Sequence, residues 1–476
     1  MLVFIAILLS MSQVLVKCEL KFVDPDIPKY PESVESVSYM LGSMTPYHVP
    51  KTCTESKALL VMRHGSKFPK QTVMDKFEKL NDFQNKLKNL YSNNNDAFKA
   101  LSADSQFVIE NIIKWENKMT SDKAKAANDK GILTTQQLAK RWNAKLINMV
   151  LDIKSEDIEF ISAPENRCVV SGEKFLSMFL TVKGQLVVDK VPEIKNKDIE
   201  DNRIKLAKGP KVLKTEKEIE DIYYETMCPE KECDLKTRIR NLLFPDGSPN
   251  FEVLRDEITS DMVKTMYLAC ANSFGYDYTD DARGHAWCTL FNYEDLKMFE
   301  DMHDIQYYYK NGYYNNKSKY FGLPMMKEIL DFLNNTTTKK FKIFSAHTSN
   351  CLSLITGFRL YQDDEKLTIE NMTKHNMINR KWRSSFIASY ACNIMVVVYN
   401  CQHTEIAENK ESQEVSIYLN EKPITVIFKE KETCTQCPIE DVKNLIGKLL
   451  DDANNELKLV SDENAEVEDT PDKSSS

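Results

Sequence analysis

The residues most able to do chemistry lie in the segment LLVMRHGSKFP, where Arg63, His64 and Lys67 follow an apolar run. One ring nitrogen of such a histidine can attack phosphorus while a backbone acceptor holds the other, and adjacent cations neutralise the oxygens of a phosphoryl group. Gly65 permits close approach of the backbone. The alternative interpretation is a histidine in a surface loop, since RHG occurs by chance in a chain of this size on the order of a few per cent of the time.

Two further basic residues directly follow apolar segments. Arg167 lies in ENRCVVS, where a helix is expected to open and a guanidinium can make a bidentate contact to phosphate. His347 lies in FSAHTSN. Each residue alone has an ordinary explanation as an exposed or capping side chain. Together they favour a phosphate site, because the ligands of open α/β sheets bind at the carboxyl ends of the strands.

The elements that must bring these residues together alternate short apolar runs with long amphipathic stretches, which is typical of an α/β fold. Strands from distant parts of the chain are expected to form one sheet: residues 58–62, 157–162, 342–345, 393–399 and 415–419. Helices are expected over about 72–153 and from near Ser171. The lysine- and glutamate-rich region 198–333 has helical spacing and predicts a second, all-helical lobe.

Composition is that of an ordinary globular chain. Of 476 residues, 42% are hydrophobic and 28% charged, which suffices for a core, and the length suggests two or three domain-sized units. Acidic residues number 71 against 63 basic ones, so the net charge of −8 argues against a nucleic-acid partner or an anionic membrane. An anionic ligand therefore needs a locally basic pocket. The acidic residues 451–476 are expected to form a disordered tail.

The first residues, MLVFIAILLSMSQVLVKC, predict a signal peptide over 1–18 and therefore a secreted protein. The alternative is a short membrane anchor, but Ser10, Ser12 and Gln13 interrupt a stretch that is already too short to span a bilayer. No stable membrane anchor is therefore expected. Four glycosylation sequons agree with secretion: Asn316, Asn334, Asn335 and Asn371.

The twelve cysteines also agree with an oxidising compartment. If Cys18 leaves with the signal peptide, eleven remain, which requires a free thiol, an intermolecular bridge or a different cleavage site. The close pairs Cys228/Cys233 and Cys434/Cys437 predict local disulfides. Zinc is the competing interpretation at Cys434, but no second pair of ligands stands near it at the required spacing.

Taken together, these motifs resemble the histidine acid phosphatases, and within them the multiple inositol polyphosphate phosphatases, over roughly residues 36–428. Besides RHG, the resemblance rests on MLGSMTPY, NRCVVS, WCTLFNYEDLKMFED with DIQYYYKNGY after it, SAH, and NIMVVVYNC followed by LNEKP. It implies a histidine-phosphatase-like sheet domain flanked by helices, formed by 36–197 and 334–430 with a helical insertion at about 72–153. The all-helical lobe would be 198–333.

By this resemblance His64 is the nucleophile that becomes phosphohistidine, while Arg63, Lys67, Arg167 and His347 surround the phosphoryl group. The resemblance implies no metal and no organic cofactor. It implies a small-molecule phosphate monoester as the substrate, and specifically an inositol polyphosphate.

Two positions depart from the family pattern. Lys67 stands where the family usually has arginine, so the charge is kept and the planar two-pronged donor is lost. The family also places an acid just after the second histidine, as HD or HAE, whereas His347 is followed by Thr348 and Ser349. That acid protonates the leaving alkoxide, which is typically worth ~10²–10⁴-fold in rate. Its loss predicts impaired turnover, and the sequence identifies no substitute carboxylate.

The leading hypothesis is thus a secreted phosphomonoesterase of the inositol polyphosphate phosphatase type with impaired turnover. The alternative is a weak or inactive relative that binds inositol phosphates or other anions. A phosphoglycerate mutase would share the RHG chemistry but fits the signal peptide and the cysteines poorly. The oligomeric state stays open. Tyrosines 307–309, 313 and 314 are interpreted as packing residues and lysines 205–214 as a solvated surface.

Overall fold

The computed structural model describes residues 52–196, 216–229, 233–244, 251–276, 285–314, 318–373, 379–405, 408–429 and 432–468. The predicted signal peptide with Cys18, the MLGSMTPY motif, Asn316 and lysines 205–214 lie outside these residues. The described residues up to His403 and from Asn409 onward belong to one compact unit. No helix in the described part of the chain is long and apolar enough to cross a membrane.

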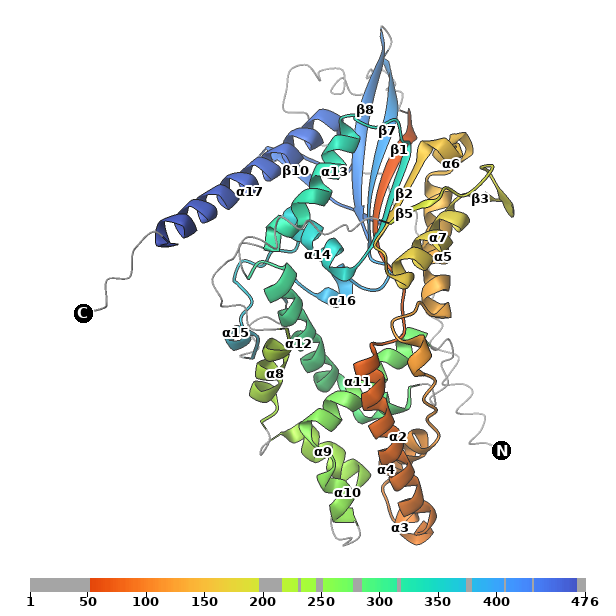
Figure 1. Cartoon of the computed structure of the whole chain (residues 1–476), viewed down its shortest axis with the longest axis vertical. Helices are drawn as coiled ribbons and strands as arrows, with labels where there is room; N and C mark the ends of the chain where they lie inside the picture. The colour runs from red at the N-terminus through yellow and green to blue at the C-terminus, as the bar shows by residue number, and fades with distance from the viewer. Residues whose placement is uncertain are drawn as a thin grey trace, which may run out of the picture. The chain divides into compact units, whose positions relative to one another are not determined.

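A mixed β-sheet forms the centre of this unit (Figure 1). Its strand order is β12-β8-β7-β1-β6-β2-β5, with β9 paired to β8. Strands β1, β6, β2 and β5 run parallel to one another, and β7 pairs antiparallel with β1 on its other side. The strands are β1 (Thr52–Arg63), β2 (Ile158–Ser162), β5 (Ile194–Asn196), β6 (Phe341–Ala346), β7 (Asn393–Glu405), β8 (Glu408–Leu419), β9 (Lys422–Pro423) and β12 (Cys437–Pro438). The expected α/β class is confirmed.

The apolar run in β1 is buried on both faces of the sheet. Leu59 and Val61 belong to one hydrophobic core, while Leu60 and Met62 belong to the other, because successive side chains of a strand point to opposite faces. Helices cover both faces: α5, α6 and α7 lie on one side of the sheet, and α13, α14 and α17 lie on the other (Figure 1). A strand segment that is apolar at every position is thus part of a central strand of a sheet that helices cover on both faces.

Helices follow β1 and β2, as expected from the sequence. They are α2 (Gln71–Ser92), α3 (Asn95–Lys99), α4 (Ala103–Ile113), α5 (Asp129–Lys145), α6 (Ile147–Asp152) and α7 (Asn166–Phe179), followed by the short hairpin β3 (Thr181–Val182) and β4 (Gln185–Leu186). The prediction that the last helix starts near Ser171 is wrong, since α7 begins at Asn166. The Ser171 hydroxyl does not cap a helix; it accepts a hydrogen bond from the Gly65 N–H at 3.0 Å.

The described residues between 216 and 333 are mainly helical. The helices are α8 (Glu216–Met227), α9 (Asp234–Leu243), α10 (Glu252–Asp256), α11 (Ser260–Tyr276), α12 (Tyr293–Asn311) and α13 (Leu323–Leu333). The tyrosines near the end of α12 pack inside the protein, as interpreted: Tyr308 and Tyr313 make edge contacts with Trp382, at 5.6 and 5.8 Å between ring centroids.

The C-terminal part adds α14 (Thr348–Gly357), α15 (Ile369–Thr373), α16 (Ser384–Ile387), β10 (Val426–Lys429), β11 (Glu432–Cys434) and α17 (Ile439–Glu468). Helix α17 disagrees with the disordered tail predicted from residue 451, as far as Glu468. Val442, Ile446, Leu450 and Ala453 recur at helical spacing and are buried, so an apolar stripe carries the helix into the acidic stretch.

Four disulfides lie within the described residues: Cys53–Cys401, Cys228–Cys233, Cys270–Cys288 and Cys434–Cys437. Both predicted local pairs are confirmed, and the bond at Cys434 leaves zinc no thiolate pair there. Three buried cysteines of the described chain are free: Cys168, Cys351 and Cys392.

Candidate active site

Three neighbouring strands end at the same edge of the sheet. Arg63 at the end of β1 pairs with Ala346 at the end of β6, and Ser162 at the end of β2 pairs with Ser345. The next residues of β1 and β6 are His64 and His347, and α7 starts just after β2. The sequence-predicted residues of the three segments are thereby brought together.

His64 is held in one tautomer. Its side chain lies almost wholly inside the protein, with Nδ1 2.7 Å from the Gly65 carbonyl oxygen. A carbonyl oxygen only accepts, so Nδ1 carries the proton and Nε2 presents a lone pair. The Arg167 Nε–H donates to that Nε2 at 3.2 Å. The ring nitrogen that could attack phosphorus therefore already faces a cation.

The loop after β1 is fixed by a close approach of two glycines. A Cβ at Gly65 would lie 2.3 Å from the carbonyl oxygen of Gly131 in α5. The Asn128 side chain joins the same two segments, since its Oδ1 accepts from the Ser66 hydroxyl and from the Gly131 N–H, both at 2.8 Å. Only glycine fits at position 65, so the RHG sequence is required by packing as well as by chemistry.

Positive charge is in excess around His64. Burial and, after it, the neighbouring Arg63, Arg167 and His347 together lower the pKa of His64 to about 2, against the effect of the backbone hydrogen bond. Burial together with Arg167 and Arg63 also lowers the pKa of Lys67 to about 8. Both lowered pKa values mean that the protonated, positively charged form of the side chain is disfavoured here. An anion bound at this place would relieve the repulsion among the cations.

Arg63 lies beneath an aromatic ring that the sequence did not single out. Its Nη1 donates to the Ala388 carbonyl at 2.5 Å, and its guanidinium carbon is 4.2 Å from the Tyr390 ring centroid. The Tyr390 ring is also 6.1 Å from the His64 ring. Arg63 Nε is buried and has no hydrogen-bond partner in the described part of the chain, so this basic cluster keeps an unused donor.

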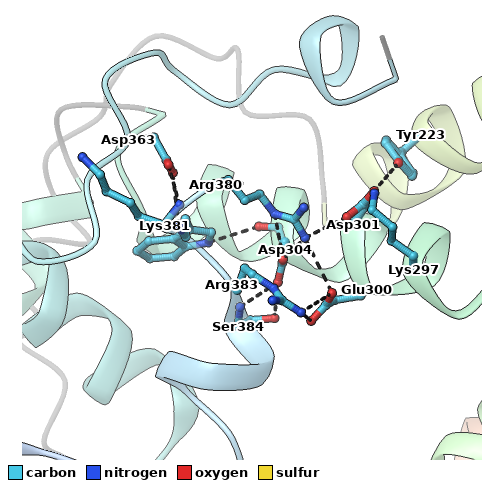
Figure 2. Close-up of polar contacts among 11 residues, drawn as sticks. Tyr223, Lys297, Glu300, Asp301, Asp304, Asp363, Arg380, Lys381, Arg383 and Ser384 are labelled. Carbon is cyan, nitrogen blue, oxygen red and sulfur yellow. Dashed lines mark hydrogen bonds and ion pairs between the residues drawn. The ribbon is translucent and has the colours of Figure 1, made fainter. Parts of the chain in front are cut away.

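The segment that carries Tyr390 is anchored by a buried ionic cluster (Figure 2). Arg380, 2% exposed in its side chain, pairs with Asp304 and lies 2.7 Å from Asp301 on α12. Arg383 forms two 2.9 Å hydrogen bonds with Glu300. The three carboxylates are of a type that can bind a cation. Two guanidiniums and the Lys297 ammonium, which lies 3.0 Å from Asp301, already neutralise them, so the cluster serves structure.

Glu165 is a second site residue, besides Tyr390, that sequence reasoning missed. It is the N-terminal flanking residue of α7, and its Oε2 lies 2.9 Å from His347 Nε2. Its Oε1 lies 3.7 Å from Arg167 Nη2, and Arg167 Nη2 lies 3.5 Å from His347 Nδ1. One guanidinium thus links this carboxylate to the His64 ring. The available signal was its place in ENRCVVS, two residues before Arg167.

Glu165, Cys168 and His347 together are ligand types that zinc accepts. The geometry argues against one shared ion, because the imidazole turns a different nitrogen to each partner: Nε2 faces Glu165 at 2.9 Å, and Nδ1 lies 3.4 Å from Cys168 Sγ. The arrangement is a hydrogen-bonded network.

Comparison with known proteins agrees with this geometry. The sequence profile of the histidine phosphatase superfamily (branch 2) matches residues 56–420, which is most of the chain. The chain belongs to the histidine phosphatase superfamily. Multiple inositol polyphosphate phosphatase 1 of Homo sapiens is 25% identical over 198 residues, or 40% of this chain and 38% of that protein. The Drosophila melanogaster protein of the same name is 26% identical over 162 residues, or 34% and 32%. The matches thus span two fifths or less of these relatives.

Solved structures of histidine phosphatases show the same fold. The phytase from D. castellii has a TM-score of 0.61 at 14% identity, over 85% of this chain and 81% of that one. The Bifidobacterium longum multiple inositol polyphosphate phosphatase, in complex with phosphate, has a TM-score of 0.53 at 14% identity, over 89% and 96%. The mixed sheet with its covering helices is therefore the fold of these phosphatases.

Helix α14 begins directly after His347. Thr348 and Ser349 are the first residues of the helix, and its first turn holds no acidic residue. The Asn350 side chain accepts from the His347 N–H at 3.1 Å and so fixes the turn. The half-buried Lys67 donates to the Phe68 carbonyl at 3.3 Å.

Proposed function

We propose that this protein is a phosphomonoesterase that hydrolyses inositol polyphosphates through a phosphohistidine at His64. The observation that carries the proposal is the pair of contacts at that ring: Nδ1 is held by the Gly65 carbonyl, and Nε2 faces the Arg167 guanidinium. A neutral imidazole is the reactive form of a histidine nucleophile, and the Nε2 lone pair becomes available when the Arg167 N–H turns to an oxygen of the bound phosphoryl group. The depressed pKa of His64 keeps it in that form.

The surrounding cations suit a phosphoryl group. Arg63, Lys67 and Arg167 supply donors to its oxygens, and His347 lies at 5.7 Å from the His64 ring. Attack by Nε2 forms a P–N bond as the bond to the leaving oxygen breaks, and water then cleaves the P–N bond and releases phosphate. Donors placed in advance stabilise the charge that develops on the oxygens.

An inositol polyphosphate is the proposed substrate because several phosphates match a pocket with such an excess of positive charge in a chain of net charge −8. The names of the relatives support the same class. We also propose secretion, which the disulfides support. The sequon residues Asn334 and Asn335 are exposed and thus open to glycosylation.

The test is phosphate release by purified protein from nitrophenyl phosphate and from inositol hexakisphosphate. We expect His64→Ala to abolish release from both while the unfolding midpoint stays close to that of the wild type. His303→Ala, in α12, is the matched control and should retain activity. Trapping an acid-labile phosphoenzyme in the wild type but not in His64→Ala would support the intermediate. Undiminished activity of a folded His64→Ala protein would contradict the proposal, and tight binding without release would favour the anion-binding alternative.

A further inference from the structure

The proposed reaction needs a proton donor for its leaving group. An alkoxide is too basic to depart unprotonated at a useful rate, and a positioned acid is typically worth ~10²–10⁴-fold. The first turn of α14 holds Thr348 and Ser349 and no acidic residue. The hydroxyl groups of serine and threonine are far too weakly acidic for this role. The donor must come from another element.

Glu165 is the carboxylate that the fold places beside the nucleophile. It enters from the start of α7, whereas His347 enters from the end of β6. Its two oxygens lie 2.9 Å from His347 Nε2 and 3.7 Å from Arg167 Nη2, and Arg167 Nε lies 3.2 Å from His64 Nε2. Since a phosphorus atom poised for attack lies ~3–3.5 Å from the nucleophile, a bound phosphoryl group contacts the same guanidinium that Glu165 faces.

We propose that Glu165 is the catalytic acid of this protein and protonates the leaving oxygen of an alkyl phosphate in place of the acid missing after His347. The inference rests on the proposed phosphatase function and assigns a residue to a step that the family motif leaves empty here.

The substrate itself supplies the conditions for this role. In the free protein burial raises the pKa of Glu165, but its backbone hydrogen bond and the adjacent His347 and Arg167 outweigh this effect and hold the pKa below its usual value. A bound phosphate ester draws His347 and Arg167 toward its own oxygens and adds negative charge nearby. Both changes raise the pKa of Glu165. The side chain is 42% exposed, so water can deliver the proton.

The two half-reactions balance. In the first, the Nε2 lone pair of His64 forms the P–N bond, the bond from phosphorus to the leaving oxygen breaks, and that oxygen takes the proton of the Glu165 carboxyl. In the second, water attacks the phosphorus and gives a proton to the Glu165 carboxylate, while the electrons of the P–N bond return to Nε2. Inorganic phosphate leaves and the carboxyl is protonated again.

A positioning role is the competing explanation, because Glu165 also holds the His347 imidazole. The two roles separate on replacement by glutamine, whose amide oxygen still accepts from His347 Nε2 but whose amide cannot donate a proton of useful acidity. A catalytic acid is lost in both Glu165→Gln and Glu165→Ala. A positioning residue is largely retained in Glu165→Gln.

The experiment compares kcat/KM for 2-glycerophosphate, which has an alkoxide leaving group, with kcat/KM for nitrophenyl phosphate, whose phenolate departs without help. We expect Glu165→Gln and Glu165→Ala each to lower the alkyl ester value by ~10²-fold or more and the nitrophenyl value by much less. Glu173→Gln, an exposed acid of the same helix, is the matched control and should change neither value.

A second variant tests for rescue. Ser349→Glu places a carboxyl where the last residue of HAE stands in the family, and in the Glu165→Gln protein it should restore the alkyl ester rate by ~10²-fold, while in the wild type it should add little. A wild type that hydrolyses both esters, with Glu165→Gln equally active, would overturn this inference and leave the phosphatase proposal standing. Alkyl ester activity lost in Glu165→Ala but kept in Glu165→Gln would assign Glu165 to positioning. A wild type that hydrolyses neither ester would overturn both proposals.

Discussion

Two regions of the protein place guanidinium groups among titratable side chains, and they differ in charge balance. In the cluster on α12, three cations meet three carboxylates: Arg380, Arg383 and Lys297 against Glu300, Asp301 and Asp304 (Figure 2). In the basic cluster at the sheet edge, formed by Arg63, Lys67 and Arg167, the carboxylate that pairs with a member among the described residues is that of Glu165, which pairs with His347 as well. The first region is neutralised internally, and the second keeps an excess of positive charge.

The comparison shows that a shifted pKa alone does not mark a binding site. Burial raises the pKa of Asp304 to about 6, even though Arg380 and Ser384 act against it, and burial lowers the pKa of His64 to about 2. In both cases the low dielectric disfavours the charged form. What distinguishes the pocket is unneutralised charge together with a lone pair directed at the same place. The balanced cluster instead fixes the segment that carries Ala388 and Tyr390.

The largest effect is expected from breaking the balanced cluster. Arg380→Ala leaves the buried carboxylate of Asp304 without a charged partner, while Asp301 keeps its ion pair with Lys297. An uncompensated buried charge typically costs ~3–5 kcal/mol of unfolding free energy. Urea unfolding measures the loss. Arg383→Ala is the control, because its side chain is 40% exposed and its pair with Glu300 should be worth about 1 kcal/mol or less. A loss below 1 kcal/mol for Arg380→Ala would show that the cluster is not what holds this segment.

The pocket should respond in the opposite way. Arg167→Ala removes a donor to the transferring oxygens, so we expect kcat/KM to fall by ~10²–10³-fold. The unfolding free energy should change by about 1 kcal/mol or less, since the loss of its contact with Glu165 is offset by relief of repulsion from the other cations. Nitrophenyl phosphate hydrolysis and urea unfolding on the same preparation test both parts. A large loss of stability with activity retained would remove the distinction between the two regions.

Much of the fold and part of the site followed from local sequence. The apolar runs in β1, β6 and β7 are buried strands, as predicted. The glycine of RHG is required by packing, because a Cβ at Gly65 would clash with the Gly131 backbone. Local patterns were less informative about where helices begin and end. The helix expected from near Ser171 begins at Asn166, and the apolar stripe of α17 continues into the acidic stretch that was expected to be disordered.

The remaining site residues depend on contacts between distant segments. Glu165 meets His347 across 182 residues, and Arg380 meets Asp304 across 76. Tyr390 reaches Arg63 through a loop whose course is set by the ionic cluster. No periodicity or spacing along the chain predicts such pairs, because they depend on which distant segments the tertiary fold brings side by side. The missing acid could therefore be inferred from the sequence, while its substitute could not.

A smaller effect should appear in the pH dependence of stability. In the unfolded chain His64 takes up a proton as pH falls through its ordinary pKa of 6.5. In the folded protein it takes up that proton only when pH falls to about 2. The unfolded state thus binds more protons, and folding loses stability as pH falls from 7 to 5, by about 2 kcal/mol for this residue. His64→Gln should lose correspondingly less between these pH values, as measured by urea unfolding. Equal losses in both proteins would mean that His64 is protonated in the folded state.

The smallest effect concerns Lys67, whose positive charge is lost at a lower pH than that of an ordinary lysine. Lys67→Arg should raise kcat/KM a few-fold at pH 6, because the guanidinium restores a two-pronged contact to the phosphoryl oxygens. The gain should grow with pH. The pKa of Lys67 lies at about 8 in the free protein, so at pH 9 roughly nine tenths of it has lost its charge, whereas an arginine stays protonated. The ratio of the two kcat/KM values should therefore rise by about tenfold between pH 6 and pH 9, and other titrating groups cancel from it. A ratio that does not change with pH would mean that Lys67 keeps its proton throughout, and a fall in kcat/KM would mean that the pocket has adapted to the narrower lysine.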